Sequence, residues 1–246
     1  MASLKANDVG IVFPIYDSRG RSFKSRLFDF VRSPSGVSPS ITLVAALRGV
    51  SLELHNGDRL GIIGRNGSGK TTLLRVLSGI YEPTSGAVTI DGTVASMTDM
   101  TMGMDPDATG EENIVIRGIL LGMTRKEAQA LIEPVREFTE LAHKLTYPIR
   151  TYSTGMLLRL AFAISTSVRP DVLVMDEMIG AGDAHFVEKA RARVAALIDA
   201  SSILVLASHN LAIIREFCTS ALLLADGAIQ QHGDVETVIA RYERES

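Results

Sequence analysis

The clearest chemical signal in the sequence is a glycine-rich loop that ends in Lys-Thr. Its members are Gly64, Arg65, Asn66, Gly67, Ser68, Gly69, Lys70 and Thr71, and Thr72 follows. An apolar run, 60–63, predicts a buried strand before the loop, and 72–77 predicts a helix after it. Backbone N–H groups and the helix N-terminus would hold phosphate oxygens, Lys70 would bridge the β- and γ-phosphates, and the Thr71 hydroxyl would bind Mg²⁺. The sequence therefore predicts a nucleoside triphosphate site. The alternative, a glycine-rich turn without function, is disfavoured because every element of the pattern is in place.

Polar residues at the ends of two later apolar runs suit the same chemistry. Runs 172–175 and 203–206 predict buried parallel strands, the first leading into Asp176 and Glu177 and the second into His209. Asp176 would support the Mg²⁺ as an outer-sphere ligand, Glu177 would orient the attacking water as a base, and His209 would face the γ-phosphate. The alternatives are ordinary loop charges for the two acids and a structural or solvated role for the histidine.

A second helix start has the composition of an anion site. An almost wholly apolar helix, 157–164, is opened by Ser153, Thr154, Gly155 and Met156. Ser and Gly at a helix N-terminus offer free N–H groups, a hydroxyl and a favourable dipole. Because the 64–71 loop already holds this chain's phosphates, we expect the second site to serve the nucleotide of another copy. The sequence thus predicts a head-to-tail dimer with ATP at each interface.

The bulk composition limits the elements that position these residues. A chain of 246 residues is long enough for one large α/β domain, 1–246, and too short for two such domains in tandem. A net charge of −3 argues against nucleic acid as the main partner. The single cysteine, Cys218, fits a core position and a reducing compartment. No apolar stretch reaches the roughly 18 residues of a membrane span, and the first residues form no signal peptide, so we expect a soluble domain.

Three segments interrupt the alternation of predicted strands and helices. Segment 17–40 contains a basic amphipathic piece, 19–32, which either contacts a membrane or partner or docks on its own sheet. A loop rich in methionine either receives a partner's coupling helix or packs under the chain's own helices; its methionines are Met97, Met100, Met102 and Met104. The third segment, about 110–166, is helical, with capping-box spacing at Thr109–Glu112 and Thr124–Glu127. Pro134 should kink its second helix. The tail predicts a hairpin, 221–232, that turns at Asp226–Gly227, and then a helix, 235–242.

The order of these motifs resembles the ATP-binding-cassette ATPases over essentially the whole chain. Their usual signature is LSGGQ, and the variant YSTGM at 152–156 resembles the ATPase subunits of bacterial O-antigen, capsule and teichoic-acid exporters. The residues at 110–114 and 179–186 also resemble those of these exporter ATPases, and so does the extra segment between the first two predicted strands. The resemblance implies an α/β P-loop NTPase fold with a mostly parallel sheet core, an antiparallel β subdomain, a helical subdomain at about 105–166 and an insertion at about 17–40.

The resemblance also assigns roles to single residues. Phe13, in the string Phe-Pro-Ile-Tyr, would stack on adenine, with Tyr16 as the alternative, and Asp183 would be the aspartate of the dimer loop. These ATPases usually place a Gln in the loop that joins the core to the helices, yet no Gln occurs before Gln129. Asp99 is nearest to that position and is interpreted as its substitute near the metal.

The function implied is ATP hydrolysis, with ATP and Mg²⁺, by a homodimer on the cytoplasmic face of the inner (plasma) membrane. The dimer would power export of a lipid-linked polysaccharide through a separate polytopic permease subunit. Some such ATPases carry a C-terminal β-sandwich that reads the glycan; only 37 residues follow His209 and there is no Trp, so we expect no such carbohydrate-binding domain and no direct glycan binding. The alternatives are another cargo such as a drug or nutrient, a soluble DNA-repair or translation ATPase, and an inactive nucleotide-gated adaptor.

Overall fold

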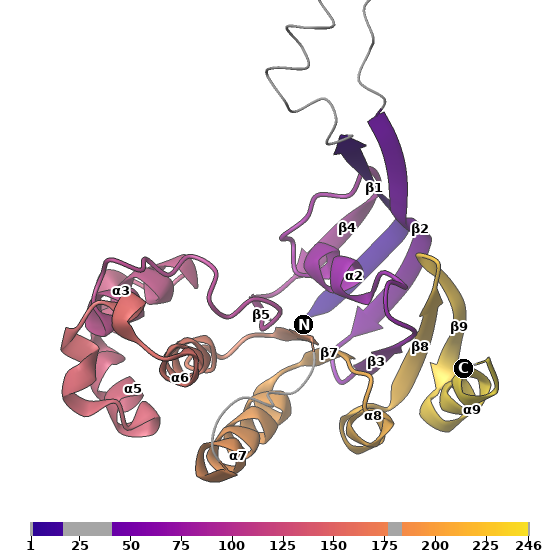
Figure 1. Ribbon diagram of the computed structural model, residues 1–246. Helices are drawn as coiled ribbons and strands as arrows, with labels where there is room; N and C mark the ends of the chain where they lie inside the picture. The colour runs from indigo at the N-terminus through magenta and orange to yellow at the C-terminus, as the bar shows by residue number, and fades with distance from the viewer. Residues whose placement is uncertain (1, 17–40, 177–183, 246) are drawn as a thin grey trace, which may run out of the picture.

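A computed structural model describes residues 2–16, 41–176 and 184–245 (Figure 1). The strands are β1 (Ser3–Tyr16), β2 (Ile41–His55), β3 (Arg59–Ile63), β4 (Ser85–Asp91), β5 (Val94–Ser96), β6 (Val172–Asp176), β7 (Ile203–Ala207), β8 (Ser220–Ala225) and β9 (Ala228–Asp234). The α-helices are α2 (Lys70–Leu77), α3 (Gly110–Leu120), α4 (Arg125–Ala130), α5 (Ile132–Thr139), α6 (Thr154–Ser165), α7 (Ala184–Ala200), α8 (Leu211–Phe217) and α9 (Val235–Glu245). Two short 3-10 helices are η2 (Ala142–Thr146) and η3 (Ile149–Thr151).

The larger sheet has six strands in the order β5-β6-β7-β3-β8-β9. Every pairing in it is parallel except that of β8 with β9. In β6 and β7, alternate residues enter two different hydrophobic clusters, so both faces of the sheet are covered. This double coverage explains why the strands are apolar throughout, and it confirms the predicted buried strands at 60–63, 172–175 and 203–206.

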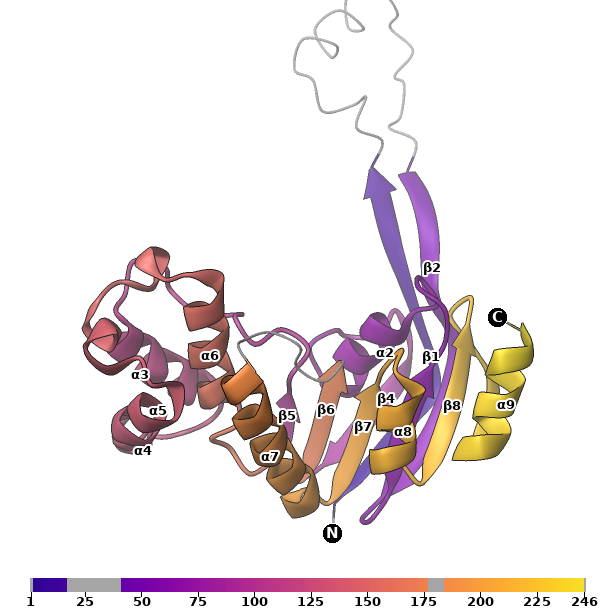
Figure 2. The ribbon, with the colours of Figure 1, turned by 60° about the horizontal axis from the view of Figure 1, so that its bottom comes forward.

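The smaller sheet is antiparallel, in the order β2-β1-β4. Helix α2 lies between the two sheets, with Leu73, Leu74, Val76 and Leu77 buried in the cluster that they share. Helices α7, α8 and α9 contribute to the cluster on the other face of the larger sheet (Figure 2). The α/β fold with an antiparallel β part is therefore as predicted.

Helices α3 to α6 form a helical lobe beyond the β5 edge of the larger sheet (Figures 1 and 2). The lobe has its own hydrophobic cluster, which includes Ile114, Val135 and Leu160. Both predicted capping boxes are present: Glu112 N–H donates to Thr109 Oγ1 at 3.1 Å, and Glu127 N–H donates to Thr124 Oγ1 at 3.3 Å. The lobe's helix starts are thus fixed by side chains, as the sequence indicates.

One helix prediction is wrong in detail. The sequence predicted a single helix kinked at Pro134, whereas α4 ends at Ala130 and α5 begins at Ile132, on either side of Leu131. Proline has no N–H, and its ring collides with the carbonyl of the residue four positions earlier, which here is Ala130. The proline therefore sits in the first turn of a new helix, where both defects are harmless.

The methionine loop packs mainly on the chain itself. Met97 is buried, Met100 packs against the cluster under α7, and Met104 packs against the lobe's cluster, while Met102 is 51% exposed. Cys218 is a buried core residue, as predicted. Among the described residues, none of the helices combines the length and the apolar character that crossing a membrane requires. The insertion predicted at 17–40 lies outside the described residues.

Candidate functional site

The glycine-rich loop connects β3 to α2, as the phosphate-binding motif requires. Gly64 has φ 154°, and a Cβ there would lie 2.2 Å from the Leu224 carbonyl oxygen, so only glycine lets the loop approach β8 this closely. Gly69 has φ 105° at the start of α2, and its Cβ would lie 2.8 Å from the Ala46 carbonyl oxygen. Glycine is thus required both by backbone conformation and by packing.

This loop forms one wall of a cavity of about 760 Å³. The cavity is lined by Val44, Ala45, Ala46, Arg48, Asn66, Gly67, Gly69, Lys70, Thr71, Thr72, Thr98, Asp176, His209, Asp226 and Gly227. Lys70 and Thr71 follow β3, Asp176 ends β6, and His209 follows β7. The carboxyl ends of these parallel strands meet at one sheet edge, which is where ligands bind in open α/β sheets. The sequence-predicted residues of three separate segments are therefore brought together.

The centre of the cavity has the oxygen donors that Mg²⁺ prefers. Thr71 Oγ1 donates a hydrogen bond to Asp176 Oδ2 at 2.7 Å, so the hydroxyl and the carboxylate are already adjacent. Hydroxyl, carboxylate and phosphate oxygens are the usual donors to this hard cation. Lys70 Nζ donates to the carbonyl oxygens of Gly64 at 2.7 Å and Arg65 at 3.1 Å, which holds the ammonium beside the loop. The donor set fits Mg²⁺ together with a polyphosphate.

His209 also contributes to a second hollow, of about 670 Å³, with Gly64, Arg65, Asn66 and Tyr242. His209 thus borders both this hollow and the larger cavity. No sequence motif predicts Tyr242 near the loop, because α9 is placed there by long-range packing on β8, β9, α8 and β3.

Three predicted site residues need separate comment. Glu177 and Asp183 lie outside the described residues. Asp99 does not line the cavity, whereas its neighbour Thr98 does. The Asp99 carboxylate instead accepts a hydrogen bond from Thr101 Oγ1 at 3.2 Å, and its charge acts on Arg117 of the helical lobe. The interpretation of Asp99 as a residue near the metal stays a prediction.

Several cavity residues were missed by sequence reasoning, most of them in β2. Arg48 N–H donates to the Gly227 carbonyl at 2.8 Å, and Gly227 N–H donates to the Ser68 carbonyl at 3.0 Å. These bonds join β2, the β8–β9 turn and the glycine-rich loop. The turn at Asp226–Gly227 was predicted, and both residues have positive φ, but nothing local in the sequence connects the turn to the cavity.

Ser153, Thr154, Gly155 and Met156 stand at the start of α6, in the helical lobe, and none lines the cavity. Ser153 Oγ accepts a hydrogen bond from Met156 N–H at 3.3 Å, a helix cap of the predicted kind. Ser153 and Thr154 are exposed, and a Cβ at Gly155 would meet nothing within 4 Å. This helix start is open to an approaching molecule and remote from the chain's own phosphate loop (Figure 1).

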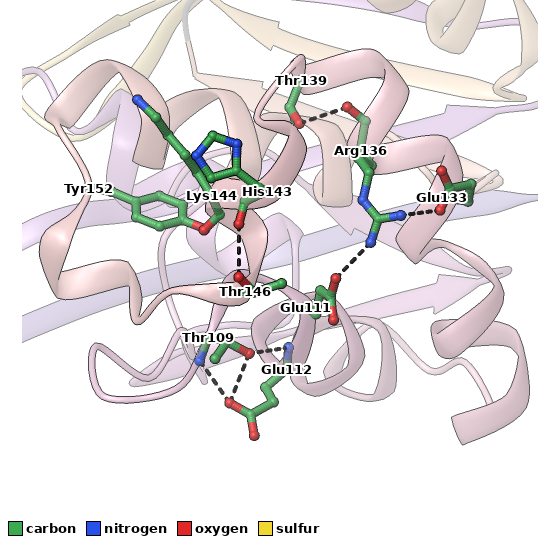
Figure 3. A network of polar contacts seen from close by, with 10 residues as sticks. All are labelled: Thr109, Glu111, Glu112, Glu133, Arg136, Thr139, His143, Lys144, Thr146 and Tyr152. Carbon is green, nitrogen blue, oxygen red and sulfur yellow. Dashed lines mark hydrogen bonds and ion pairs between the residues drawn. The ribbon is translucent and has the colours of Figure 1, made fainter.

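Polar contacts hold this helix start within the lobe (Figure 3). Tyr152 OH donates to the Lys144 carbonyl at 2.7 Å, and burial, with the nearby Glu111 carboxylate, raises the pKa of Tyr152 to about 12. Arg136 bridges Glu111, at 2.6 Å, and Glu133. The phenol therefore stays protonated and donates to η2, while Arg136 joins Glu111 of α3 to α5, and the Glu111 charge acts on Tyr152 without a direct bond.

Comparison with known proteins agrees with this geometry. The family model described as "ABC transporter" matches residues 47–180. The O-antigen export system ATP-binding protein RfbE of Yersinia enterocolitica is 41% identical over 233 residues, covering 94% of this chain and 98% of the relative. The corresponding RfbB of Myxococcus xanthus is 42% identical over 90% of this chain, which spans 50% of that longer relative. The teichoic acids export ATP-binding protein TagH of Staphylococcus haemolyticus is 37% identical, covering 81% of this chain and 75% of the relative.

Solved structures share the fold at lower sequence identity. A dimeric ATP-binding cassette in a post-hydrolysis state, bound to ADP and phosphate, aligns with a TM-score of 0.69 at 19% identity. The alignment covers 94% of this chain and 98% of that one. An ATP-binding subunit of an ABC transporter aligns with a TM-score of 0.70 at 18% identity, covering 98% and 93%.

Proposed function

The chain belongs to the ABC transporter family of ATP-binding proteins, and we propose that it is the ATP-hydrolysing subunit of a lipid-linked polysaccharide exporter. The observation that carries the proposal is the cavity in which Lys70, Thr71, Asp176 and His209 converge. Relatives named for O-antigen and teichoic acid export support the class of cargo.

The chemistry follows from the cavity. ATP would lie with its phosphates on the glycine-rich loop and Lys70, while Thr71 and Asp176 would hold Mg²⁺, which neutralises phosphoryl charge when bound. His209 would hydrogen-bond the γ-phosphate. Glu177, which directly follows Asp176, would act as the base that orients the attacking water. Phe13, and Asp183 at the dimer loop, complete the proposed site.

A homodimer would complete each site with a second copy. Ser153, Thr154, Gly155 and Met156 offer a capped helix N-terminus that is exposed and outside the chain's own cavity. The free N–H groups of α6 would donate hydrogen bonds to the γ-phosphate bound to a facing subunit, and the helix dipole would stabilise its negative charge. The active species is thus a head-to-tail dimer with two composite sites.

A groove on the helical lobe supports docking of a membrane permease. Its volume is about 710 Å³, and it is lined by Asp105, Asp107, Ala108, Glu111, Glu112, Val115, Ile116, Ile119, Arg125, Gln129 and Ile132. A lining that combines apolar side chains with four carboxylates and one arginine suits a short amphipathic helix that carries basic residues. Such docking would hold the ATPase at the cytoplasmic face of the membrane as a peripheral subunit.

Phosphate release by purified protein, with and without Mg²⁺, tests the enzymatic part. Lys70→Ala should abolish release, and an inactive wild type would leave a nucleotide-gated adaptor as the function. Affinity capture from membranes tests the transport part. Recovery of a polytopic subunit encoded beside glycan-assembly genes supports polysaccharide export, whereas a drug or nutrient permease would reassign the cargo.

A further inference from the structure

We propose that Tyr81 positions the Phe13 ring for the nucleotide base; this inference rests on the proposed ATP site and deepens it. Phe13 lies in β1 directly opposite Val44 of β2, and Val44 lines the nucleotide cavity. Residues directly opposite each other in an antiparallel pair project from the same face of the sheet. Phe13, which is 39% exposed, therefore projects from the same sheet face as Val44 and lies next to the cavity, although it is not among the residues that line it.

The Phe13 ring has one aromatic neighbour among the described residues, Tyr81. The two ring centroids are 5.9 Å apart, and the planes meet at 75°, which is the edge-to-face arrangement that aromatic pairs favour. A partly exposed phenylalanine on a strand has several staggered conformations available. Contact with a fixed second ring selects one of them before the base arrives.

Tyr81 is itself fixed by Arg75 at both of its ends. Tyr81 N–H donates to the Arg75 carbonyl at 3.1 Å, and Arg75 Nη1 donates to Tyr81 OH at 2.9 Å. The Arg75 guanidinium also lies 5.5 Å from the centroid of the Tyr81 ring. Arg75 belongs to α2, the helix that begins with Lys70 and Thr71. The tyrosine is thus anchored to the helix that carries the phosphate-binding residues.

The segment that carries Tyr81 is also bonded to β1 beside Phe13. Thr84 N–H donates to the Gly10 carbonyl at 2.8 Å, and Val12 N–H donates to Thr84 Oγ1 at 3.1 Å. The segment from Arg75 to Thr84 therefore connects α2, which carries the phosphate-binding residues, to β1, which carries Phe13. This connection would keep the Phe13 ring at a constant distance from the glycine-rich loop. The base and the triphosphate of one nucleotide would then be recognised together.

A double-mutant cycle on the full-length protein tests the proposal, with the KM of ATP hydrolysis and the Kd of ATP as readouts. Tyr81→Leu keeps apolar bulk against the core but removes the ring, and should raise both constants about 2- to 12-fold, the worth of an edge-to-face pair. The kcat should stay within about twofold of the wild-type value, because the substitution leaves the phosphate-binding residues unchanged. Tyr81→Phe keeps the ring and should have a smaller effect. Tyr147→Leu, at an exposed tyrosine of the helical lobe, is the matched control and should change neither constant.

The Phe13→Ala background separates this inference from the proposed function. If Tyr81 acts through Phe13, Tyr81→Leu should add nothing to Phe13→Ala. Equal effects of Tyr81→Leu in both backgrounds, or no effect in the wild type while Phe13→Ala raises KM, would overturn the positioning role alone. An unchanged KM in Phe13→Ala itself would instead remove Phe13 from the proposed base site.

Discussion

Ser153→Arg should abolish ATP hydrolysis while leaving ATP binding by the monomer nearly intact. Ser153 is exposed at the start of α6 and does not line the chain's own cavity, so a bulky cation there would disturb only a nucleotide held by a facing copy. Lys70→Ala should be inactive for the opposite reason, because Lys70 belongs to the chain's own cavity. The two inactive proteins can therefore be combined.

The recovery on mixing follows from the symmetry of a head-to-tail dimer. In the heterodimer, the substituted loop of the Lys70→Ala chain faces the substituted helix start of the Ser153→Arg chain. One interface therefore contains both substitutions, and the other interface contains neither. Random exchange makes half of the dimers mixed, and each has one of two sites intact, so turnover should reach about a quarter of the wild-type value if the sites act independently.

The assay is phosphate release as a function of mixing ratio, with heterodimers verified by two affinity tags. A maximum near equimolar mixing is expected. The control is a chain that carries both substitutions, mixed with wild type. Its heterodimers have no complete interface, so turnover should fall as the square of the wild-type fraction, without a maximum at an intermediate ratio. Wild-type turnover by Ser153→Arg alone would refute the shared site, and no recovery despite verified heterodimers would refute independent sites.

Three further outcomes test the cavity and the core. Glu177→Gln should lower hydrolysis by about 10²–10⁴ while ATP binding persists, and hydrolysis near the wild-type rate would exclude its role as base. Thr71→Ala removes the hydroxyl 2.7 Å from Asp176 and should raise the Mg²⁺ concentration for half-maximal activity about 10- to 100-fold, with Thr71→Ser as the control; an unchanged Mg²⁺ requirement would argue against this ligand. Burial raises the pKa of Cys218 to about 12 from a usual value of 9.0, so the native thiol should resist alkylation at pH 8. The thiol ionises at lower pH in the unfolded chain than in the folded protein, so the contribution of Cys218 to the free energy of unfolding should fall as pH rises from about 9 to 12. Rapid labelling of the native protein at pH 8 would contradict the raised pKa.

Features with local causes were predictable from sequence. The glycine-rich loop and the strands β3, β6 and β7 depend on short runs of residues, and the capping boxes at Thr109 and Thr124 depend on a spacing of three. The meeting of Lys70, Asp176 and His209 followed from a general rule, since parallel strands bring their carboxyl ends to one edge.

Features that depend on distant pairing were not predictable. The cavity wall at Val44–Arg48 exists because β2 is hydrogen-bonded to the turn between β8 and β9. The bonded residues Arg48 and Gly227 are 179 positions apart in the sequence. The role of Tyr81 likewise depends on the packing of the segment after α2 against β1. Neither contact has a signature within one stretch of sequence, because each side chain is unremarkable until its partner is known.

The position of the helical lobe explains how a membrane partner could control hydrolysis. The proposed docking groove and the start of α6 lie on the same lobe. Glu111 lines the groove and binds Arg136, and its charge also acts on Tyr152, the residue before Ser153 (Figure 3). A helix that pushes on the groove would therefore move Ser153 with the lobe, toward or away from a facing γ-phosphate. Because Lys70, Thr71 and Asp176 belong to the sheet edge and not to the lobe, nucleotide binding would persist while completion of the site is regulated. If the proposed dimer and permease docking hold, separation of the two half-sites within one chain would make hydrolysis responsive to a partner.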